Sequence, residues 1–486
     1  MSKNNNNTFV QQIANIHEDF SQWYTDVVLK TELADYGPVK GTMVIRPYGY
    51  AIWEKIQEEL NIRFKKTGHK NAYFPMMIPY SFFAKEAEHV KGFAPEVALV
   101  THYGEEELAE KLIVRPTSET IICDMYSKWV KSWRDLPVLI NQWANVFRCE
   151  KTTRPFLRTS EFLWQEGHTL HASHEEAEEE VLKMLGVYEE FTKNILAMPV
   201  LVGKKSEKEK FAGANATYGM EAMMLDGKSL QAGTSHDLGC NFAKGFNIKY
   251  LDKNGELQYP FQTSWGVSTR LIGALIMAHG DQRGLVLPPR VAPIQVVIVP
   301  IATHKGGVIE VAQQIKTQLE QENIRVELDT REQSAGFKFN DWEMKGVPIR
   351  LEIGPKDIEN GVAVIARRDS FDKINVNIND LQGEIPKILD AIHENMYQKS
   401  LAQLNSHIVV CHTMEEMQTA LDNGNFVKAM WCGSRQCEDT VKAQMSASTR
   451  VMPFDQTPVG TKCICCGKDC SAESDEGKVI YFARAY

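Results

Sequence analysis

Residues 147–169 read F-R-C-E-K-T-T-R-P-F-L-R-T-S-E-F-L-W-Q-E-G-H-T, which predicts a strand, an arginine-rich loop and a returning strand. Side chains alternate along a strand, so Arg148 and Glu150 are expected on one face. A guanidinium can bind a phosphate bidentately, and a carboxylate can accept the amino group of adenine. Further positive charge and a ring for base stacking come from Arg154, Arg158 and Phe162. The hairpin is therefore predicted to bind a nucleotide such as ATP.

The hairpin resembles motif 2 of the class II aminoacyl-tRNA synthetases in its F-R-x-E start and its closing R-T-S-E-F. The longer run R-T-S-E-F-L-W-Q-E-G-H-T is similar to prolyl-tRNA synthetases of the archaeal and eukaryotic-like type. This resemblance covers essentially the whole chain. It implies an α/β (α+β) fold with three parts: a class II synthetase antiparallel-sheet catalytic domain, an α/β anticodon-binding domain and a C-terminal zinc-binding α/β domain.

Length and composition fit a multidomain globular protein. A chain of 486 residues is too long for one core, and 43% hydrophobic with 24% charged residues is ordinary globular usage. The net charge of −9 argues against binding nucleic acid by bulk electrostatics, although basic residues can still concentrate on one face. No apolar run approaches the ~18 residues that a membrane span needs. The N-terminal M-S-K-N-N-N-N has no apolar segment, so we expect a cytoplasmic protein.

Patterns along the chain predict three regions. The proline-rich stretch Pro288-Pro289-Arg-Val-Ala-Pro293 marks a linker, so we expect a catalytic domain over 1–289, an anticodon-binding domain over 290–398 and a zinc-binding domain over 399–486. In the first region, periodicity predicts helices over 20–33 and 49–66, strands over 41–46 and 72–78, and a helix opened by the capping box Ser173-His-Glu-Glu176. In the second, it predicts a largely parallel sheet with strands over 294–299, 324–328, 349–353 and 362–366 and a helix over 308–322.

The segment N-A-Y-F-P-M-M-I-P, residues 71–79, resembles motif 1, which forms a dimer interface in the family. Taken without the resemblance, an apolar strand that carries Pro75 and Pro79 favours a sheet edge. With the resemblance, the segment implies a homodimer.

The proline pocket is assigned through the resemblance. R-P-T-S-E, residues 115–119, resembles the family's amino-acid-recognition loop, in which a hydroxyl and a carboxylate can accept hydrogen bonds from a protonated secondary amine. Alone, T-S-E is an ordinary helix cap. The charged loop K-K-S-E-K-E-K-F ends in the phenylalanine that the family places in the pocket. The implied pocket residues are Thr117, Glu119, Arg148, Phe162, Trp164, Phe211 and His236.

Two further segments complete the implied ATP site. Q-A-G-T-S-H, residues 231–236, is similar to a family segment that reaches the nucleotide. T-S-W-G-V-S-T-R stands where motif 3 is expected but keeps only Gly266 of its repeated glycines. Its last residue, Arg270, would begin an apolar helix and hold the outer phosphates. The implied ATP-binding residues are Arg148, Glu150, Arg158, Thr159, Phe162, Gln231, Thr234, Ser268 and Arg270, of which Arg148, Glu150 and Arg270 are the catalytic residues.

The second and third regions carry an implied RNA contact and a metal site. G-V-P-I-R-L-E-I-G-P-K-D, residues 346–357, resembles the anticodon-binding domain of class IIa synthetases. Side chains suited to the base edges of an unstacked loop are Asn340, Glu343, Lys345 and Arg350. The pairs Cys432-x4-Cys437 and Cys463-x2-Cys466 predict a structural Zn²⁺ site of four thiolates. Competing ligands are Cys465 and Cys470, and an exchange of Cys465 for Cys466 stays open.

The resemblance implies an aminoacyl-tRNA ligase that activates L-proline with ATP and Mg²⁺ and transfers it to tRNA(Pro). In the family, the C-terminal tyrosine, here Tyr486, approaches the active site. One alternative is a non-catalytic synthetase-like tRNA-binding paralogue, which the intact Arg148, Glu150 and Arg270 disfavour. The other is a zinc-dependent nucleic-acid-binding protein, which the acidic pI of about 5.9 disfavours. Bacterial-type relatives place an editing domain between motifs 2 and 3, and the stretch between Arg158 and Arg270 leaves no room for one.

Overall fold

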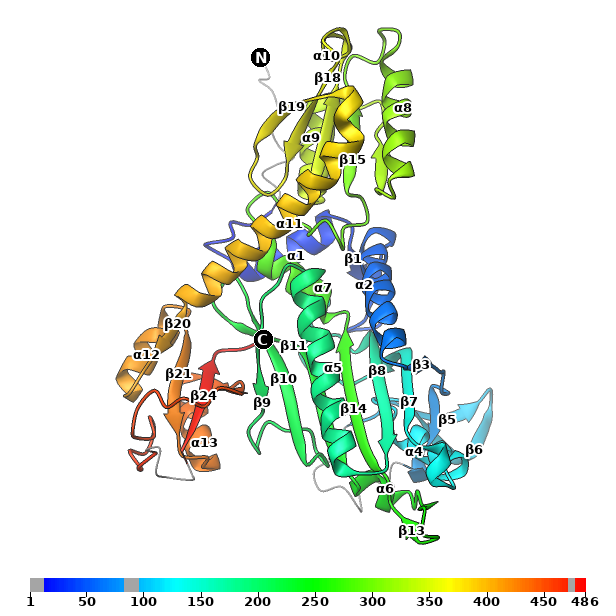
Figure 1. Ribbon diagram of the computed structural model, residues 1–486, viewed down its shortest axis with the longest axis vertical. Helices are drawn as coiled ribbons and strands as arrows, with labels where there is room; N and C mark the ends of the chain where they lie inside the picture. Colours follow the sequence, from blue (N-terminus) through cyan, green and yellow to red (C-terminus); the bar gives the residue numbers. More distant parts are fainter. Residues whose placement is uncertain (1–12, 83–95, 471–476) are drawn as a thin grey trace.

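The computed structural model describes residues 13–82, 96–470 and 477–486. Its largest layer is an eight-stranded sheet with the order β23-β9-β10-β11-β14-β8-β7-β3 (Figure 1). Neighbouring strands are antiparallel except β3 and β7. Its members are β3 (Lys70–Asn71), β7 (Val138–Phe147), β8 (Glu161–His171), β9 (Leu201–Lys204), β10 (Ala216–Met223), β11 (Ser229–Gly239), β14 (Phe261–Ser268) and β23 (Met452–Pro453). The antiparallel catalytic sheet is confirmed.

The hairpin of β7 and β8 contains the arginine-rich segment. β7 ends at Phe147, so the prediction that Arg148 and Glu150 share a strand face is wrong. Pairing extends one step further, because the Arg148 amide donates to the Ser160 carbonyl at 2.7 Å. Past Arg148 the chain no longer pairs in the β7–β8 ladder, and an isolated bridge between Arg154 and Arg158 closes the loop.

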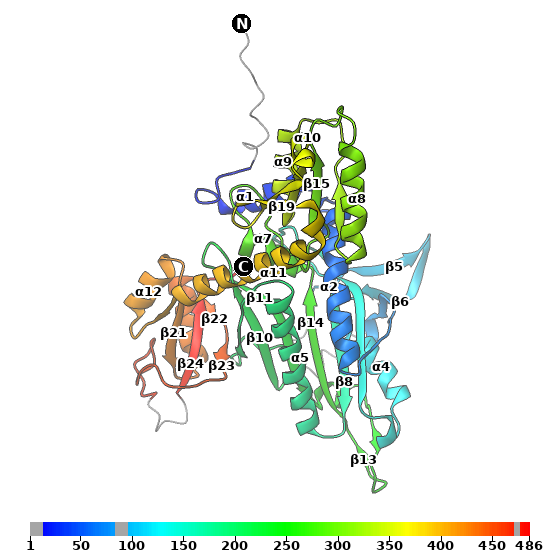
Figure 2. The same cartoon turned by 45° about the horizontal axis from the view of Figure 1, so that its top comes forward.

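Alternation along β8 separates the two faces of the sheet. Gln165 accepts a hydrogen bond from the Tyr188 hydroxyl of α5 at 2.6 Å, so Glu166 faces the opposite side. On the Gln165 side, the helices form a layer across the strands (Figures 1 and 2). They are α1 (Phe20–Lys30), α2 (Pro47–Lys66), α5 (His174–Asn194) and α7 (Arg270–His279). The aromatic centre of this core is Trp53, Phe64, Tyr188 and Trp265. The other face is left for a binding site.

The predicted helices of this region are confirmed with small shifts at their ends. Ser173 caps α5, and its hydroxyl accepts from the Glu176 amide at 3.2 Å. The single strand predicted over 72–78 is wrong. Of this segment only Met77 and Ile78 lie in a strand, because the Phe74 amide donates to the Gln142 side chain at 2.5 Å and Pro75 has no N–H to continue a ladder. The strand that contains Pro79, β4 (Met77–Pro79), is an edge strand of a three-stranded sheet, as the proline favours.

Smaller elements surround this sheet. Two strands pair as β1 (Ala34–Tyr36) and β2 (Met43–Ile45), and a three-stranded sheet has the order β4-β6-β5. Its strands are β4 (Met77–Pro79), β5 (Leu99–Tyr103) and β6 (Glu106–Val114). Further elements are α4 (Glu119–Trp129), α6 (Asn241–Gly245), β12 (Tyr250–Leu251) and β13 (Leu257–Gln258).

A second sheet has the order β16-β15-β17-β18-β19. Its strands are β15 (Val296–Pro300), β16 (Val326–Leu328), β17 (Ile349–Ile353), β18 (Val362–Arg367) and β19 (Lys373–Asn377). Only β16, β15 and β17 are parallel, so the largely parallel sheet is wrong. The short connection from β17 to β18 cannot make the parallel crossover, which needs at least about ten residues. The helices are α8 (Val308–Gln321), α9 (Ala335–Met344), α10 (Pro355–Glu359) and α11 (Leu381–Ser406).

The long helix α11 leads from the second sheet to a third unit (Figure 1). That unit is a four-stranded sheet with the order β20-β21-β24-β22. Its elements are β20 (Ile408–Val410), α12 (Met414–Asp422), β21 (Phe426–Trp431), α13 (Arg435–Met445), β22 (Ser448–Thr449) and β24 (Lys478–Ala483). Across the described ranges, every helix is too short or too polar to cross a membrane.

Candidate active site

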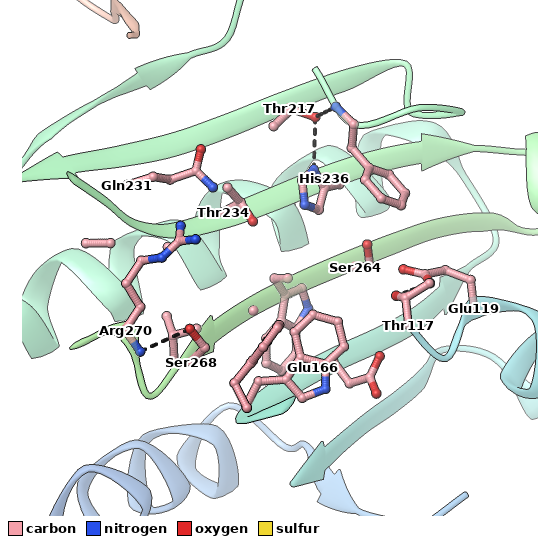
Figure 3. Close-up of a pocket in the computed structure, with 18 of the residues that line it drawn as sticks. Thr117, Glu119, Glu166, Thr217, Gln231, Thr234, His236, Ser264, Ser268 and Arg270 are labelled. Carbon is pink, nitrogen blue, oxygen red and sulfur yellow. Dashed lines mark hydrogen bonds between the residues drawn. The ribbon is translucent and has the colours of Figure 1, made fainter. Parts of the chain in front are cut away.

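A pocket lies on the open face of the large sheet, over β8, β10, β11 and β14 and between the first turns of α4 and α7 (Figure 3). The two helix starts approach it from opposite ends: α7 follows directly on β14 of the large sheet, and α4 follows the loop after β6 of the three-stranded sheet. Most of the residues nominated from sequence meet here. They are Thr117, Glu119, Arg148, Phe162, Trp164, Phe211, Gln231, Thr234, His236, Ser268 and Arg270.

Two arginines make one part of the pocket positive. The Arg148 guanidinium lies over the rings of Phe162 and Trp164, at 5.3 and 5.4 Å, and its Nε donates to the Pro116 carbonyl at 3.0 Å. Arg270 is the first residue of α7, and its Nε donates to the Leu157 carbonyl at 3.1 Å. Burial and repulsion by Arg148 lower the pKa of Arg270, but an arginine stays charged at any ordinary pH. The pair therefore offers preorganised positive charge to an anionic ligand.

The opposite part of the pocket is acidic. Glu119 begins α4 and accepts a short hydrogen bond from the Thr117 hydroxyl. Burial, reinforced by the neighbouring Glu166, raises the pKa of Glu119. Glu166 is held by Ser118 at 2.5 Å and by His168 at 2.8 Å.

Glu166 and His168 form a buried ion pair. Burial alone would raise the pKa of Glu166, but the hydrogen bond and charge of His168 outweigh it and lower the value. The same contact raises the pKa of His168 against the effect of burial. This part of the pocket therefore presents two carboxyl groups beside the His168 imidazole, which suits a cationic ligand group.

A hydrogen-bonded corner connects these two parts. Thr217 of β10 contacts His236 Nδ1 at 2.9 Å and accepts from the Phe211 amide at 2.9 Å (Figure 3). The Phe211 ring lies 5.0 Å from the His236 imidazole. Burial, with the charges of His168 and Lys205, lowers the pKa of His236 to about 3, so this imidazole is neutral. The corner therefore offers the apolar ring of Phe211 to a ligand. Trp164, which also lines the pocket, has a buried Nε1–H donor without a partner in the described part of the chain.

Three of the residues nominated for ATP do not line the pocket. Glu150 and Arg158 lie in the loop of the β7–β8 hairpin, with Oε2 and Nε 3.9 Å apart. The Arg158 charge still contributes to lowering the pKa of Arg270, so it lies close to the pocket. Thr159 is buried and donates to the Glu161 carbonyl at 2.6 Å.

Sequence reasoning missed five polar residues of the pocket. They are Glu166, His168, Glu209, Thr217 and Ser264. The first two continue the alternation that already joined Phe162 and Trp164 on one face of β8, so period-two reasoning could have found them. Thr217 and Ser264 come from strands whose neighbours are fixed only by the sheet order, and no local signal marks them.

The last residue of the chain lies beside the hairpin loop. Arg154 stacks over the Tyr486 ring at 5.7 Å, and the Tyr486 hydroxyl donates to Asp226 at 2.5 Å. The Tyr486 amide also donates to the Ser229 carbonyl at 3.1 Å. Tyr486 therefore approaches the motif 2 loop, although it does not line the pocket itself.

A second, basic pocket lies on the five-stranded sheet. It is lined by Glu343 and Arg350, whereas Asn340 and Lys345 do not line it. Lys345 is occupied by an ion pair with Glu32 at 3.0 Å. Lining residues that sequence reasoning missed include Arg283, Arg367, Arg368, Phe371 and Lys373. Four cations and an aromatic ring in this set are typical of a site for unstacked bases.

The four predicted cysteine ligands meet in the third unit. The sulfur atoms of Cys432, Cys437, Cys463 and Cys466 all lie within 4.8 Å of one another. Cys432 Sγ is 3.7 Å from both Cys437 Sγ and Cys466 Sγ. Tetrahedral zinc with bonds of about 2.3 Å needs sulfur atoms about 3.8 Å apart. The donor set therefore fits zinc, and Cys465 and Cys470 lie outside this cluster within the described residues.

The antiparallel sheet, its arginine-bearing hairpin and the arginine that opens α7 define a class II aminoacyl-tRNA synthetase. Residues 102–279 match the family model of the tRNA synthetase class II core domain (G, H, P, S and T), and residues 295–388 match an anticodon binding domain. Residues 414–486 match the model for the prolyl-tRNA synthetase C-terminal region.

Curated relatives cover nearly the whole chain. The chain is 58% identical to a protein named Proline--tRNA ligase from Alkaliphilus oremlandii, over 98% of each chain. It is 54% identical to Proline--tRNA ligase 2 of Clostridioides difficile, over 99% of each, and 53% identical to Proline--tRNA ligase 2 of Bacillus cereus. The chain belongs to the prolyl-tRNA synthetase family.

Proposed function

We propose that this chain is a proline--tRNA ligase that activates L-proline with ATP and transfers the prolyl group to tRNA(Pro). The observation that carries the proposal is the two-sided pocket. Its arginines, Arg148 and Arg270, suit phosphates and a carboxylate, and Glu119 with Thr117 suits a protonated secondary amine. Such an enzyme acts in the cytoplasm, where tRNA is charged.

In the activation step the proline carboxylate attacks the α-phosphate in line and pyrophosphate leaves. Mg²⁺ enters as part of the ATP complex. Arg148 is the arginine of the basic part that borders the acidic part, because its guanidinium interacts with the charges of Glu119 and Glu166 as well as with that of Arg270. It can therefore contact the carboxylate and the α-phosphate together. Arg270 and Arg158 hold the outer phosphates, while Glu150, Gln231, Thr234 and Phe162 bind the adenosine. The protein acts by positioning and by neutralising charge, without a covalent enzyme intermediate.

We expect the KM for proline to rise as the pH falls toward the raised pKa of Glu119. Only the ionised carboxylate accepts from the substrate's cationic nitrogen, and burial makes it protonate at a higher pH than an ordinary carboxyl group. The measurement is proline-dependent pyrophosphate exchange across an acidic pH series. Glu119→Gln raises the KM at every pH and removes its pH dependence. A variant whose KM still follows pH like the unmodified chain would contradict this role.

We expect the enzyme to activate alanine at a detectable rate and not to clear alanyl-tRNA(Pro). Phe162, Trp164, Phe211 and His236 select by shape, and each missing methylene costs a competitor only about 1 to 3 kcal/mol. The chain between β8 and β14, which is fully described, is filled by α5, α6, the sheet strands β9, β10 and β11, and the short strands β12 and β13, with no inserted domain.

The measurement is deacylation of preformed alanyl-tRNA(Pro). The expected rate equals that of buffer alone, and hydrolysis well above it would refute the prediction.

The absence of an inserted domain also supports the archaeal and eukaryotic-like subtype. We further propose domain limits of 1–289, 290–398 and 399–486. Each range has a sheet of its own, and β23 of the third range also joins the edge of the first sheet.

We propose that the anticodon of tRNA(Pro) binds the basic pocket of the five-stranded sheet. Arg350 stacks on Phe339 at 4.2 Å and bonds Glu352 at 2.9 Å, so its guanidinium is held rigidly. Glu343 adds an acceptor for base amino groups. Asn340 and Lys345 flank the pocket, where contacts to the loop backbone suit them better than base contacts.

We propose a structural Zn²⁺ held by Cys432, Cys437, Cys463 and Cys466. Four thiolates leave no open coordination position, so the ion stabilises the third unit and takes no part in the chemistry.

We also propose a homodimer through motif 1. Large apolar side chains there and on the small sheets stay exposed, with Tyr73 71% and Tyr103 60% accessible. Sedimentation at micromolar concentration tests the dimer.

Proline-dependent pyrophosphate exchange, followed by charging of tRNA(Pro), separates the candidate functions. A proline--tRNA ligase performs both. A non-catalytic paralogue binds tRNA(Pro) without exchange, and a zinc-dependent nucleic-acid-binding protein has no response to proline. Absence of exchange in the zinc-loaded protein would overturn the proposed function.

A further inference from the structure

The third unit contributes a strand and a buried arginine to the catalytic sheet. β23 pairs with β9, so Met452 lies opposite Lys204 and Pro453 opposite Gly203. A Cβ on Gly203 would lie 2.1 Å from the Met452 carbonyl oxygen, so the two strands leave no space for a side chain. Beside this contact, Phe454 stacks on Tyr218 of β10 with ring centroids 6.0 Å apart.

Arg450 completes a charge cluster inside the catalytic domain. Its Nε lies 3.4 Å from Glu221 Oε2, and Glu221 also pairs with Lys205. Ser229 donates to the same carboxylate at 2.5 Å. Arg450, Glu221 and Lys205 are all buried, and removing one partner from a buried pair leaves an uncompensated charge that costs several kcal/mol.

Lys205 begins the loop that carries two residues of the pocket. Next to it, Ser206 contacts Thr449 of the third unit at 3.3 Å, and both its carbonyl and its hydroxyl accept from the Glu209 amide. Glu209 and Phe211 line the pocket. The loop is therefore fixed from one side by Arg450 and Thr449 and from the other by Thr217.

The same junction leads back to the cysteine cluster. Thr449 donates to Glu438 at 3.3 Å, and Glu438 follows Cys437 in α13. The side chains from the cysteine cluster to the proline pocket thus form one continuous series of contacts.

We propose that Arg450 is a positioning residue for the amino-acid pocket: it anchors Lys205 and Ser206 so that Phe211 closes on the substrate ring. The third unit thereby sets the affinity for the amino acid, although it lies outside the site. This inference rests on the proposed function, since it names the half of the pocket that the unit controls. The ATP half depends on Arg148 and Arg270, whose guanidinium groups are held by the Pro116 and Leu157 carbonyls. Of the junction residues, Glu221 acts on Arg270 only through its charge.

Separate KM values for proline and ATP test this role. We expect Arg450→Met to raise the KM for proline roughly tenfold or more and to leave the KM for ATP within about twofold. In the same variant, the ratio of kcat/KM for proline to kcat/KM for alanine falls as well. Arg450→Lys keeps the charge near Glu221 and restores part of the affinity. The matched control is Arg435→Met in α13, whose side chain is 78% exposed, and it leaves both KM values unchanged.

A second variant covers the case in which Arg450→Met does not fold. Gly203→Ala separates β9 from β23 without changing any charge, and we expect the same selective rise in the KM for proline. Unchanged values in a folded variant, or equal rises for proline and ATP, would overturn the positioning role. Lack of proline-dependent exchange by the unmodified chain would instead overturn the proposed function and this inference with it.

Discussion

Arg148→Ala is expected to reduce proline-dependent pyrophosphate exchange by a factor of ~10² or more while the chain stays folded. The guanidinium lies over two aromatic rings between the acidic and basic parts of the pocket, so it meets charge that develops in the transition state. One preorganised contact of this kind contributes roughly 3 kcal/mol, which corresponds to that factor. Arg270→Ala gives the same pattern with a larger rise in the KM for ATP.

Arg134→Ala is the matched control, because Arg134 is exposed and stacks only on Trp133. It retains full exchange activity. Circular dichroism and thermal unfolding verify that each variant folds. A folded Arg148→Ala protein with near-normal exchange would remove the basis for assigning the reaction to this pocket.

Cys466→Ser is expected to abolish zinc binding, from about one ion per chain to almost none, and to destabilise the third unit. Metal binding at such a site is part of the folding free energy, and one lost thiolate breaks the tetrahedral set. Metal analysis of freshly purified protein gives the stoichiometry, and limited proteolysis reports the loss of structure after residue 406.

The neighbouring Cys465→Ser is the control, because Cys465 lies outside the cluster although it adjoins Cys466 in sequence. It retains zinc. Loss of zinc from Cys465→Ser and not from Cys466→Ser would show that Cys465, and not Cys466, is the fourth ligand. Freshly purified protein without zinc would refute the site.

The family resemblance nominated residues that are far apart in the sequence and meet in one pocket of the structure. Arg148, Arg270 and every residue of the segment 231–236 except Ser235 line the pocket, because sheet pairing brings together segments that each carry a short motif. Glu166 and His168 were missed although they continue the alternation of β8. Because the two side chains bond to each other, a purely structural role would also explain them. Only the structure shows that they line the pocket.

Long-range pairing explains what the sequence could not predict. The mixed sheet of the second unit follows from the short link between β17 and β18, which no residue type marks. The strand predicted over 72–78 is mostly lost because the Phe74 amide donates to the side chain of Gln142, which lies far along the chain. The pairing of β23 with β9 joins two domains, and periodicity within either segment contains no information about it.

That pairing affects the order in which the enzyme matures during synthesis. The ribosome makes β9 early, but its partner β23 follows roughly 250 residues later, so the edge of the catalytic sheet stays open in the nascent chain. The buried Glu221 likewise lacks its ion pair with Arg450 until the third unit has been synthesised. The full affinity for the amino acid is therefore expected only after the third unit has folded, so the pocket matures last although most of its residues are made first.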